Sequence, residues 1–168
     1  MRATSYIRWI PAVLIMAVIF YSSSQPYHKQ DMRPRLHKLL PEKQIAEQFS
    51  GVRFQYAGEV VSIQHLGVPG FVEFFIRKGA HLFIYMALGA AVAYALYRIR
   101  RKAALFGLSV LFCALYAASD EFHQSLTGDR TPLAIDVGID TAGAVIGVGL
   151  YLLFRIIAAN FRISRSHP

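Results

Sequence analysis

Four apolar segments of the chain are separated by polar stretches, and each is long enough to predict a helix that crosses a membrane. Such a helix needs roughly 20 mainly apolar residues, within a usual range of about 17–25. The first and third segments reach only the lower end of that range. The four segments are Tyr6–Ser22, Gly79–Tyr97, Ala103–Ser119 and Leu133–Ile157.

These segments predict an all-α integral membrane protein in which residues 1–168 form one domain, a four-transmembrane-helix bundle. Two stretches would lie outside the cell membrane: an extracytoplasmic loop of roughly 50 residues between the first two helices, Gln25–Ile76, and a shorter loop, Asp120–Pro132. The composition agrees, because 55% of the residues are hydrophobic, 17% are charged and the mean hydropathy is +0.38. A soluble domain carries about 25% charged residues.

The charged residues indicate the orientation of the bundle. Half of the 18 Lys and Arg residues lie before or at the start of the first segment, between the second and third, or at or after the end of the fourth, with no acidic residue beside them. All ten Asp and Glu residues lie in the other stretches or the adjoining helix ends. Short loops rich in Lys and Arg remain in the cytoplasm. We therefore expect a multi-pass protein of the bacterial cell membrane with both termini cytoplasmic. The net charge of +8 reflects this topology, and we expect no nucleic-acid partner.

Two features of the apolar segments bear on processing and redox chemistry. Arg2, Arg8, the apolar run and the small residues Ser22–Ser24 are also typical of a cleaved signal peptide. Because no A-x-A cleavage motif is present, we favour a retained anchor. Cys113, the single cysteine, lies in the third segment, where we expect a small core or lipid-facing residue. A single cysteine excludes an intramolecular disulfide and the paired-cysteine zinc and redox motifs.

The long outer loop should have local structure of its own. Leu36–Phe49 has apolar residues at helical spacing, interrupted by a proline, which predicts a short amphipathic helix after that proline. Val52–Tyr56 alternates apolar and polar positions, and a turn at Ala57-Gly58 leads into Val60–Ile63, a pattern typical of a β-hairpin. The aromatic stretch Phe71–Ile76 favours an interfacial or re-entrant approach to the second segment. We expect this loop to pack over the outer helix ends rather than to form a separate binding domain.

Polar side chains gather at the predicted outer ends of the second, third and fourth helices. On the second and fourth helices they recur at helical spacing and therefore share one face of each. Charged residues at such depths are unfavourable against lipid and usually face one another or a water-filled site. We therefore expect one outer polar site. Its candidate residues are Lys78, His81 and Tyr85 of the second helix, Asp120, Glu121 and Gln124 at the end of the third, Arg130 of the following loop, and Asp136 and Asp140 of the fourth.

Deeper in the fourth helix, glycines continue the face that carries the two aspartates. Gly143 and Gly147 follow Asp136 at i+7 and i+11, and Gly149 comes shortly after. Small residues spaced by four allow two helices to approach closely within a membrane. These glycines therefore predict close helix packing.

Three chemistries fit the outer polar site. Histidine and carboxylate side chains suit zinc or another divalent metal. Because no HxxxH or HExxH spacing occurs, and because Lys78 and Arg130 would repel a cation, we expect no metal. Alternatively, Glu121 or Asp120 could act as a general base with His81 as its proton partner, although no G-x-S-x-G nucleophile motif is present. Third, Arg130 and Lys78 could bind an anionic headgroup without turnover. No cofactor is identified, and the presence of an enzymatic activity stays open.

The order and spacing of these motifs resemble the VanZ family. The resemblance implies a four-helix membrane protein of the Gram-positive cell envelope, associated with low-level resistance to the glycopeptide teicoplanin, and it implies no particular reaction. One departure is Asp140, where many relatives have Asn, so this chain adds a negative charge to the fourth helix. The matching residues are Phe20–Gln25, Arg77-Lys-x2-His81-x3-Tyr85, Ser119-Asp-Glu-x2-Gln124, Gly128-x-Arg130 and Asp136-x3-Asp140-x2-Gly143-x3-Gly147.

From these features we predict a VanZ-like envelope protein whose outer polar site binds or modifies a lipid-linked or cell-surface component. The expected partners are membrane lipids or a lipid-linked envelope precursor, and the oligomeric state stays open. One alternative is a non-catalytic scaffold or binding protein that uses its extracytoplasmic loop. Another is that the buried charges only hold the helices together. The binding residues of the predicted site would be Lys78, Tyr85, Gln124, Arg130, Asp136 and Asp140.

Overall fold

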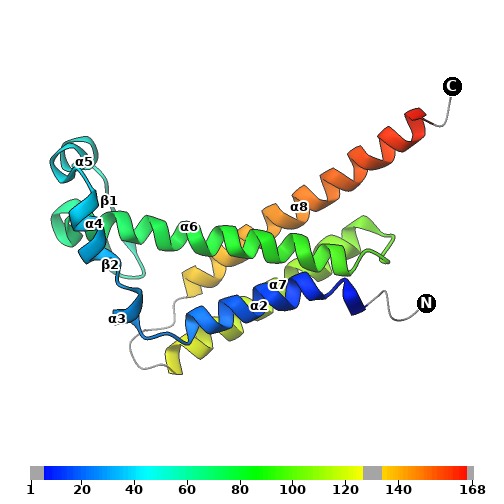
Figure 1. The fold of residues 1–168 in the computed structure, drawn as a ribbon, viewed down its shortest axis with the longest axis horizontal. Coiled ribbons are helices and arrows are strands. Elements are labelled where there is room, and N and C mark those ends of the chain that lie inside the picture. The colour runs from blue at the N-terminus through cyan, green and yellow to red at the C-terminus, as the bar shows by residue number, and fades with distance from the viewer. Residues whose placement is uncertain (1–5, 127–133, 166–168) are drawn as a thin grey trace.

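A computed structural model describes residues 6–126 and 134–165 of the protein. The long helices form an elongated body, and a small cap of short helices and a β-hairpin lies at the start of α6 (Figure 1). α2 begins and α8 ends at the opposite end of the body (Figure 1). The elements in chain order are α2 (Ile10–Ser23), α3 (Tyr27–Gln30), α4 (Arg33–Leu39), α5 (Glu42–Phe49), β1 (Arg53–Tyr56), β2 (Glu59–Ser62), α6 (Ile63–Ala95), α7 (Lys102–Leu126) and α8 (Ala134–Arg165).

Three helices of the described chain, α6, α7 and α8, are long and apolar enough to cross a membrane. α2 is apolar but has only 14 residues. At about 1.5 Å per residue it is roughly 21 Å long, less than the roughly 30 Å of the hydrocarbon layer. It is shorter than the predicted segment because residues 8 and 9 form a turn. The protein is therefore a helical membrane protein, and the fourth crossing stays a prediction.

α6 begins at Ile63 rather than at Gly79, so Phe71–Ile76 is neither a loop nor a re-entrant segment. The element has 33 residues, and the part after Gly67, residues 68–95, is roughly 42 Å long at about 1.5 Å per residue, which exceeds a hydrocarbon layer of about 30 Å. The backbone bends at Gly67, whose φ of 68° favours glycine. Pro69 lies two residues later, in the first turn after the bend, where a missing N–H is tolerated. Glycine and proline often end a helix, but here the chain bends at these two residues and continues as a helix.

α7 also continues further than predicted, to Leu126. Residues 120–126 are therefore a helix end and not part of a loop. This extra helix keeps Asp120, Glu121 and Gln124 at fixed spacing, and all three are buried. The rest of the predicted second loop lies outside the described residues.

The segment between α2 and α6 contains the expected local structure. The amphipathic helix after the proline is α5, and β1 pairs antiparallel with β2 across the turn at Ala57-Gly58. Aromatic rings attach this cap to the start of α6: Phe49 lies 6.2 Å from Phe71 and Tyr56 lies 5.1 Å from Phe74, between ring centroids. The cap packs against α6, because α4, α5 and β2 all contact that helix, and its placement over the other outer helix ends stays a prediction.

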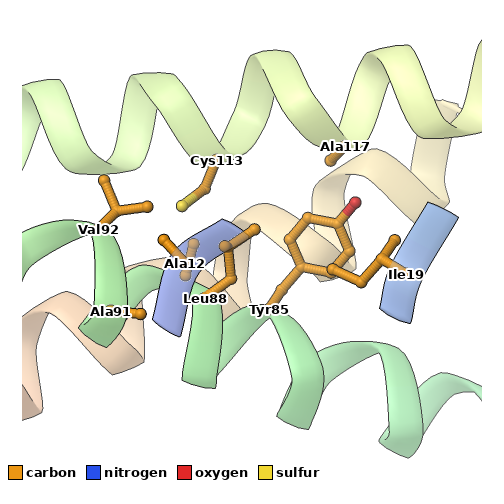
Figure 2. Packing of buried hydrophobic residues seen from close by; sticks show 9 residues of the cluster. Ala12, Ile19, Tyr85, Leu88, Ala91, Val92, Cys113 and Ala117 are labelled. Carbon is orange, nitrogen blue, oxygen red and sulfur yellow. The ribbon is translucent and has the colours of Figure 1, made fainter. Parts of the chain in front are cut away.

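The bundle core is built mainly from small and medium-sized side chains. Figure 2 shows Tyr85 and Leu88 of α6 between α7 and α2, with Cys113 and Ala117 of α7 facing them. Ala12 of α2 closes the other side and is fully buried, as are Tyr85, Leu88 and Cys113. Cys113 is thus a core residue. Because the contact residues of α7 and α2 are small, the helices approach closely around the large Tyr85 ring.

Glycines bring α6 and α8 into backbone contact. A Cβ atom added at Gly143 would clash with the carbonyl oxygen of Leu82, and one added at Gly147 would clash with that of Met86. On the facing helix, a Cβ at Gly89 would lie 2.9 Å from the Ala144 Cα. The predicted packing role is thus confirmed for Gly143 and Gly147. It is wrong for Gly149, where an added Cβ would meet nothing within 4 Å.

We expect Gly147→Ala to destabilise the protein by about 1–3 kcal/mol, the usual effect of forcing an extra methyl group into a close-packed core. The matched control is Gly149→Ala on the same helix, which should be neutral or slightly stabilising because alanine favours a helix over glycine by about 1 kcal/mol. Thermal unfolding of both variants in the same detergent measures the difference. Equal melting temperatures would contradict the close approach of α6 and α8.

Candidate functional site

Two polar pairs join α6 to α8 at the capped end of the crossing. The Lys78 Nζ donates to Asp136 Oδ1 at 2.5 Å. One helical turn further along, the His81 Nδ1 lies 3.2 Å from Asp140 Oδ1. Both aspartate side chains are largely buried, at 16% and 4% exposure. An isolated buried charge is very unfavourable. Pairing with Lys78 and His81 therefore allows both carboxylates to lie between the helices.

The hairpin contributes a tyrosine that the sequence analysis did not single out. Tyr56 of β1 donates its hydroxyl hydrogen to Asp136 Oδ1, the same oxygen that accepts from Lys78. The Lys78 ammonium also lies 4.7 Å from the centroid of the Tyr56 ring, within cation–π range. Burial and the Asp136 carboxylate raise the pKa of Tyr56 above its ordinary value, so the phenol remains a hydrogen-bond donor. The alternation of β1 is the only signal in the sequence that could have indicated this side chain.

α7 supplies the third wall of the site. The Gln124 Nε2 donates to Asp120 Oδ2 at 3.0 Å, and Glu121 is buried beside them. Two side chains here have an unsatisfied polar atom. Among the described residues, the Asp120 Oδ1 and the Tyr85 hydroxyl have no hydrogen-bond partner. Figure 2 shows the Tyr85 hydroxyl extending toward α7 beside Ala117.

A further buried carboxylate anchors the cap to α6. Glu73 is 3% exposed and accepts from the backbone N–H of Met32 at 3.2 Å. Its other oxygen lies 3.7 Å from the Arg33 Nε, and the same guanidinium also pairs with Asp31 at 2.6 Å. This hydrogen-bonded pairing lowers the pKa of Asp31 to about 2. Glu73 was missed by sequence reasoning because its partners are set by how the cap docks, which no local pattern records.

Two cavities flank the polar residues, and three side chains, Arg77, His81 and Gln124, line both of them. The first cavity has a volume of about 330 Å³ and lies between α2, α6 and α7. The second cavity, about 620 Å³, lies under the hairpin between α6, α7 and the start of α8. Volumes of this size are usual for small-ligand sites, which range over about 300–1,000 Å³. The site residues of the first cavity are His81, Tyr85, Asp120 and Gln124, and those of the second are Tyr56, Lys78, His81, Glu121, Gln124 and Asp136.

The structure thus brings together all of the predicted site residues that it describes. Lys78, His81 and Tyr85 come from α6, the carboxylates from α7 and α8, and they meet at one end of the bundle. Arg130 lies outside the described residues. Asp140, the departure from the resembling family, is paired with His81 and does not border either cavity directly.

The histidine and carboxylates of the site can form hydrogen bonds and transfer protons. In the part of the chain that the structure describes, no three His, Cys, Asp or Glu side chains converge to hold a metal ion. A carboxylate bonded to one ring nitrogen of a histidine orients the imidazole and leaves the other nitrogen for a ligand or proton. His81 has this relation to Asp140, and it lines both cavities.

Comparison with known proteins identifies a single family. The family described as VanZ/LLP1 matches residues 8–155, which include α2 to α7, most of α8 and the whole candidate site. No curated protein matches the chain. No solved structure matches it either.

We expect Tyr56→Phe to loosen the hairpin, because it removes the hydrogen bond that ties β1 to α8. A hydrogen bond to a charged group contributes about 1.5–3 kcal/mol, so amide hydrogen exchange in β1 and β2 should accelerate roughly tenfold or more. The control is Tyr21→Phe on α2, whose side chain is largely exposed and should leave exchange unchanged. Unchanged protection of the hairpin in Tyr56→Phe would show that ring packing alone holds the cap.

Proposed function

The chain belongs to the VanZ/LLP1 family, and from this membership we propose that it is a cell-envelope protein that lowers sensitivity to the glycopeptide teicoplanin. In this proposal the polar site at the capped end of the bundle binds a lipid-linked or cell-surface component from the outer leaflet. Glycopeptides with a lipid tail act at that surface, so binding or altering one of its components would weaken their action. The cytoplasmic placement of both termini belongs to the same proposal and rests on the distribution of Lys and Arg.

One observation supports a binding site over a purely structural set of charges. If the polar residues only held the helices together, each buried polar atom would be expected to find a partner within the bundle, as buried groups generally do. Lys78 with Asp136 and His81 with Asp140 follow this rule. The Asp120 Oδ1 and the Tyr85 hydroxyl do not among the described residues, and both side chains line the first cavity.

The contacts also refine how each residue would act. Lys78 has its charge offset by Asp136 within the site, so it positions α8 and the hairpin more than it attracts a free anion. Recognition then depends on hydrogen-bonding groups that face the cavities, His81, Gln124 and Asp120. Arg130 keeps its proposed role as a contact to an anionic part of the ligand. The charge and the planar geometry of an arginine side chain suit that role.

A second candidate function is modification of the bound component. The His81–Asp140 pair favours it, because an oriented imidazole next to a carboxylate-lined cavity can move a proton. Glu121 would then serve as the general base at the second cavity, with His81 as its proton partner. A turnover assay needs the ligand first, so binding is the more direct proposal to test.

The scaffold alternative, in which the segment between α2 and α6 alone binds a partner, is less well supported by the contacts. That segment is joined to the site through Tyr56 with Asp136, Gln30 with Arg77, and Arg33 with Glu73. Deleting residues 29–48 would therefore disturb the site as well as the segment. Point substitutions separate the two functions better than a deletion does.

We expect expression of the wild type in a Gram-positive host to raise the teicoplanin concentration needed to stop growth. Glu121→Gln and His81→Gln should each lose that protection, because they remove a charge or the paired imidazole while keeping a polar side chain of similar size. The measurement is teicoplanin and vancomycin susceptibility with membrane abundance matched by immunoblot. Arg130→Ala extends the same test to the loop.

The matched control is Glu47→Gln on the exposed face of the cap, which should protect as the wild type does. Two outcomes would contradict the proposal. Either the wild type gives no protection, or the site variants protect fully at equal abundance. A loss of protection that follows a loss of abundance would instead favour the structural role of the charges.

A further inference from the structure

Two residues that line the first cavity, Asp120 and Tyr85, each have a buried polar atom with no partner among the described residues, and the two atoms differ in kind. The Asp120 Oδ1 can only accept a hydrogen bond when the carboxylate is ionised, whereas the Tyr85 hydroxyl can donate or accept. Asp120 is 5% exposed and Tyr85 is fully buried. Leaving such a group unsatisfied is unfavourable, and more so when it is charged. A ligand group that donates to Asp120 would remove that cost.

The charges around the first cavity are balanced. Arg77 is the one permanent cation among its described lining residues and Asp120 the one carboxylate. An ammonium group would meet the Arg77 guanidinium, and a phosphate would meet the Asp120 carboxylate. A neutral group with several hydroxyls avoids both conflicts, because each hydroxyl can donate to the carboxylate and accept from another neighbour.

One wall of the first cavity is apolar. It is formed by Val18 and Ile19 of α2 and by Ala80 and Ile84 of α6. The Val18 side chain is more than half exposed, on a helix whose other faces are also apolar. Since Val18 is exposed on a helix that is apolar on all faces, this wall adjoins an apolar outer surface of the bundle. A ligand with a polar head and an apolar chain fits a cavity that has polar residues at one end and an apolar wall.

We propose that the first cavity binds the uncharged, hydroxyl-rich headgroup of a glycolipid, with Asp120 and Tyr85 as its hydrogen-bonding residues. This inference rests on the proposed function and specifies the class of component that the site takes. Gln124 donates a hydrogen bond to one oxygen of the Asp120 carboxylate. The other oxygen can therefore accept a hydrogen bond from one hydroxyl of the headgroup. The apolar chain would lie along α2 and α6, which distinguishes a lipid-linked sugar from a free one.

The test is thermal unfolding of the purified protein in a detergent without a sugar headgroup. The probes are diglucosyldiacylglycerol, phosphatidylglycerol, phosphatidylethanolamine and free maltose, each titrated separately. We expect a saturable rise in melting temperature with the glycolipid and at least tenfold weaker responses to the other three. Asp120→Asn should weaken glycolipid binding tenfold or more and Tyr85→Phe about fivefold, in line with charged and neutral hydrogen bonds.

Two tyrosine variants make a matched pair. The Tyr85 hydroxyl has no partner in the described bundle, so Tyr85→Phe should leave the melting temperature without ligand unchanged or slightly raised. The Tyr116 hydroxyl instead donates to the backbone oxygen of Met16 at 2.7 Å, so Tyr116→Phe should lower that temperature. Glycolipid affinity should follow the opposite order: reduced in Tyr85→Phe and retained in Tyr116→Phe.

Any of three results would overturn the inference. These are no preference for the glycolipid over the two phospholipids, an equal response to maltose, or full glycolipid affinity in both Asp120→Asn and Tyr85→Phe, as a cavity filled only by water would give. The proposed function fails separately, through the susceptibility assay. Protection against teicoplanin without glycolipid binding would refute only this inference, and glycolipid binding without protection would refute only the proposed function.

Discussion

The close approach of α6 and α8 is the contact on which the rest of the structure depends. Gly143 and Gly147 let the α8 backbone lie against Leu82 and Met86 of α6. Following the same two helices toward the cap, the facing residues change from glycine and aliphatic to charged. Apolar packing at the glycines thus sets the distance between helices at which a histidine or lysine of α6 reaches an aspartate of α8. Longer side chains at the crossing would separate the pairs and leave buried carboxylates exposed to an apolar environment.

The cap extends this arrangement beyond the membrane-crossing helices. Tyr56 of the hairpin donates a hydrogen bond to Asp136. Glu73 accepts a hydrogen bond from a backbone N–H of the cap and pairs with the guanidinium of Arg33 in α4. Two carboxylates thus attach the hairpin and α4 to the same polar end. The second cavity exists because the hairpin forms its roof, whereas the first cavity lies between helices only. The two cavities share Arg77, His81 and Gln124. A ligand in one cavity would therefore contact residues that also line the other.

Helical periodicity is a local property of the sequence, and it correctly predicted which residues share one face of a helix. Lys78, His81 and Tyr85 share a face of α6, and the aspartates and glycines share a face of α8, because each spacing is fixed by one helix. The hairpin followed from alternation and a turn in the same way. Docking is not local. Tyr56 and Glu73 owe their partners to tertiary contacts of the cap, with α8 for Tyr56 and with α6 for Glu73, and no local pattern indicates these partners. The start of α6 was misplaced because the predicted segment began after the charged residues Arg77 and Lys78, whereas the helical element includes them and begins at Ile63, where aromatic rings pack it against the cap.

A double-mutant cycle across Lys78 and Asp136 tests most directly whether the polar pairs between α6 and α8 act as units. The free energy of unfolding would be measured for Lys78→Met, Asp136→Leu and the double variant in one detergent. Each single variant leaves a charge without its partner, so both should be strongly destabilised, and the double variant should recover part of the loss. We expect a coupling free energy above about 1 kcal/mol, within the roughly 0.5–3 kcal/mol range for residues in contact. Strictly additive effects would contradict the account, because they would mean that the two helices are held at this end without the pair.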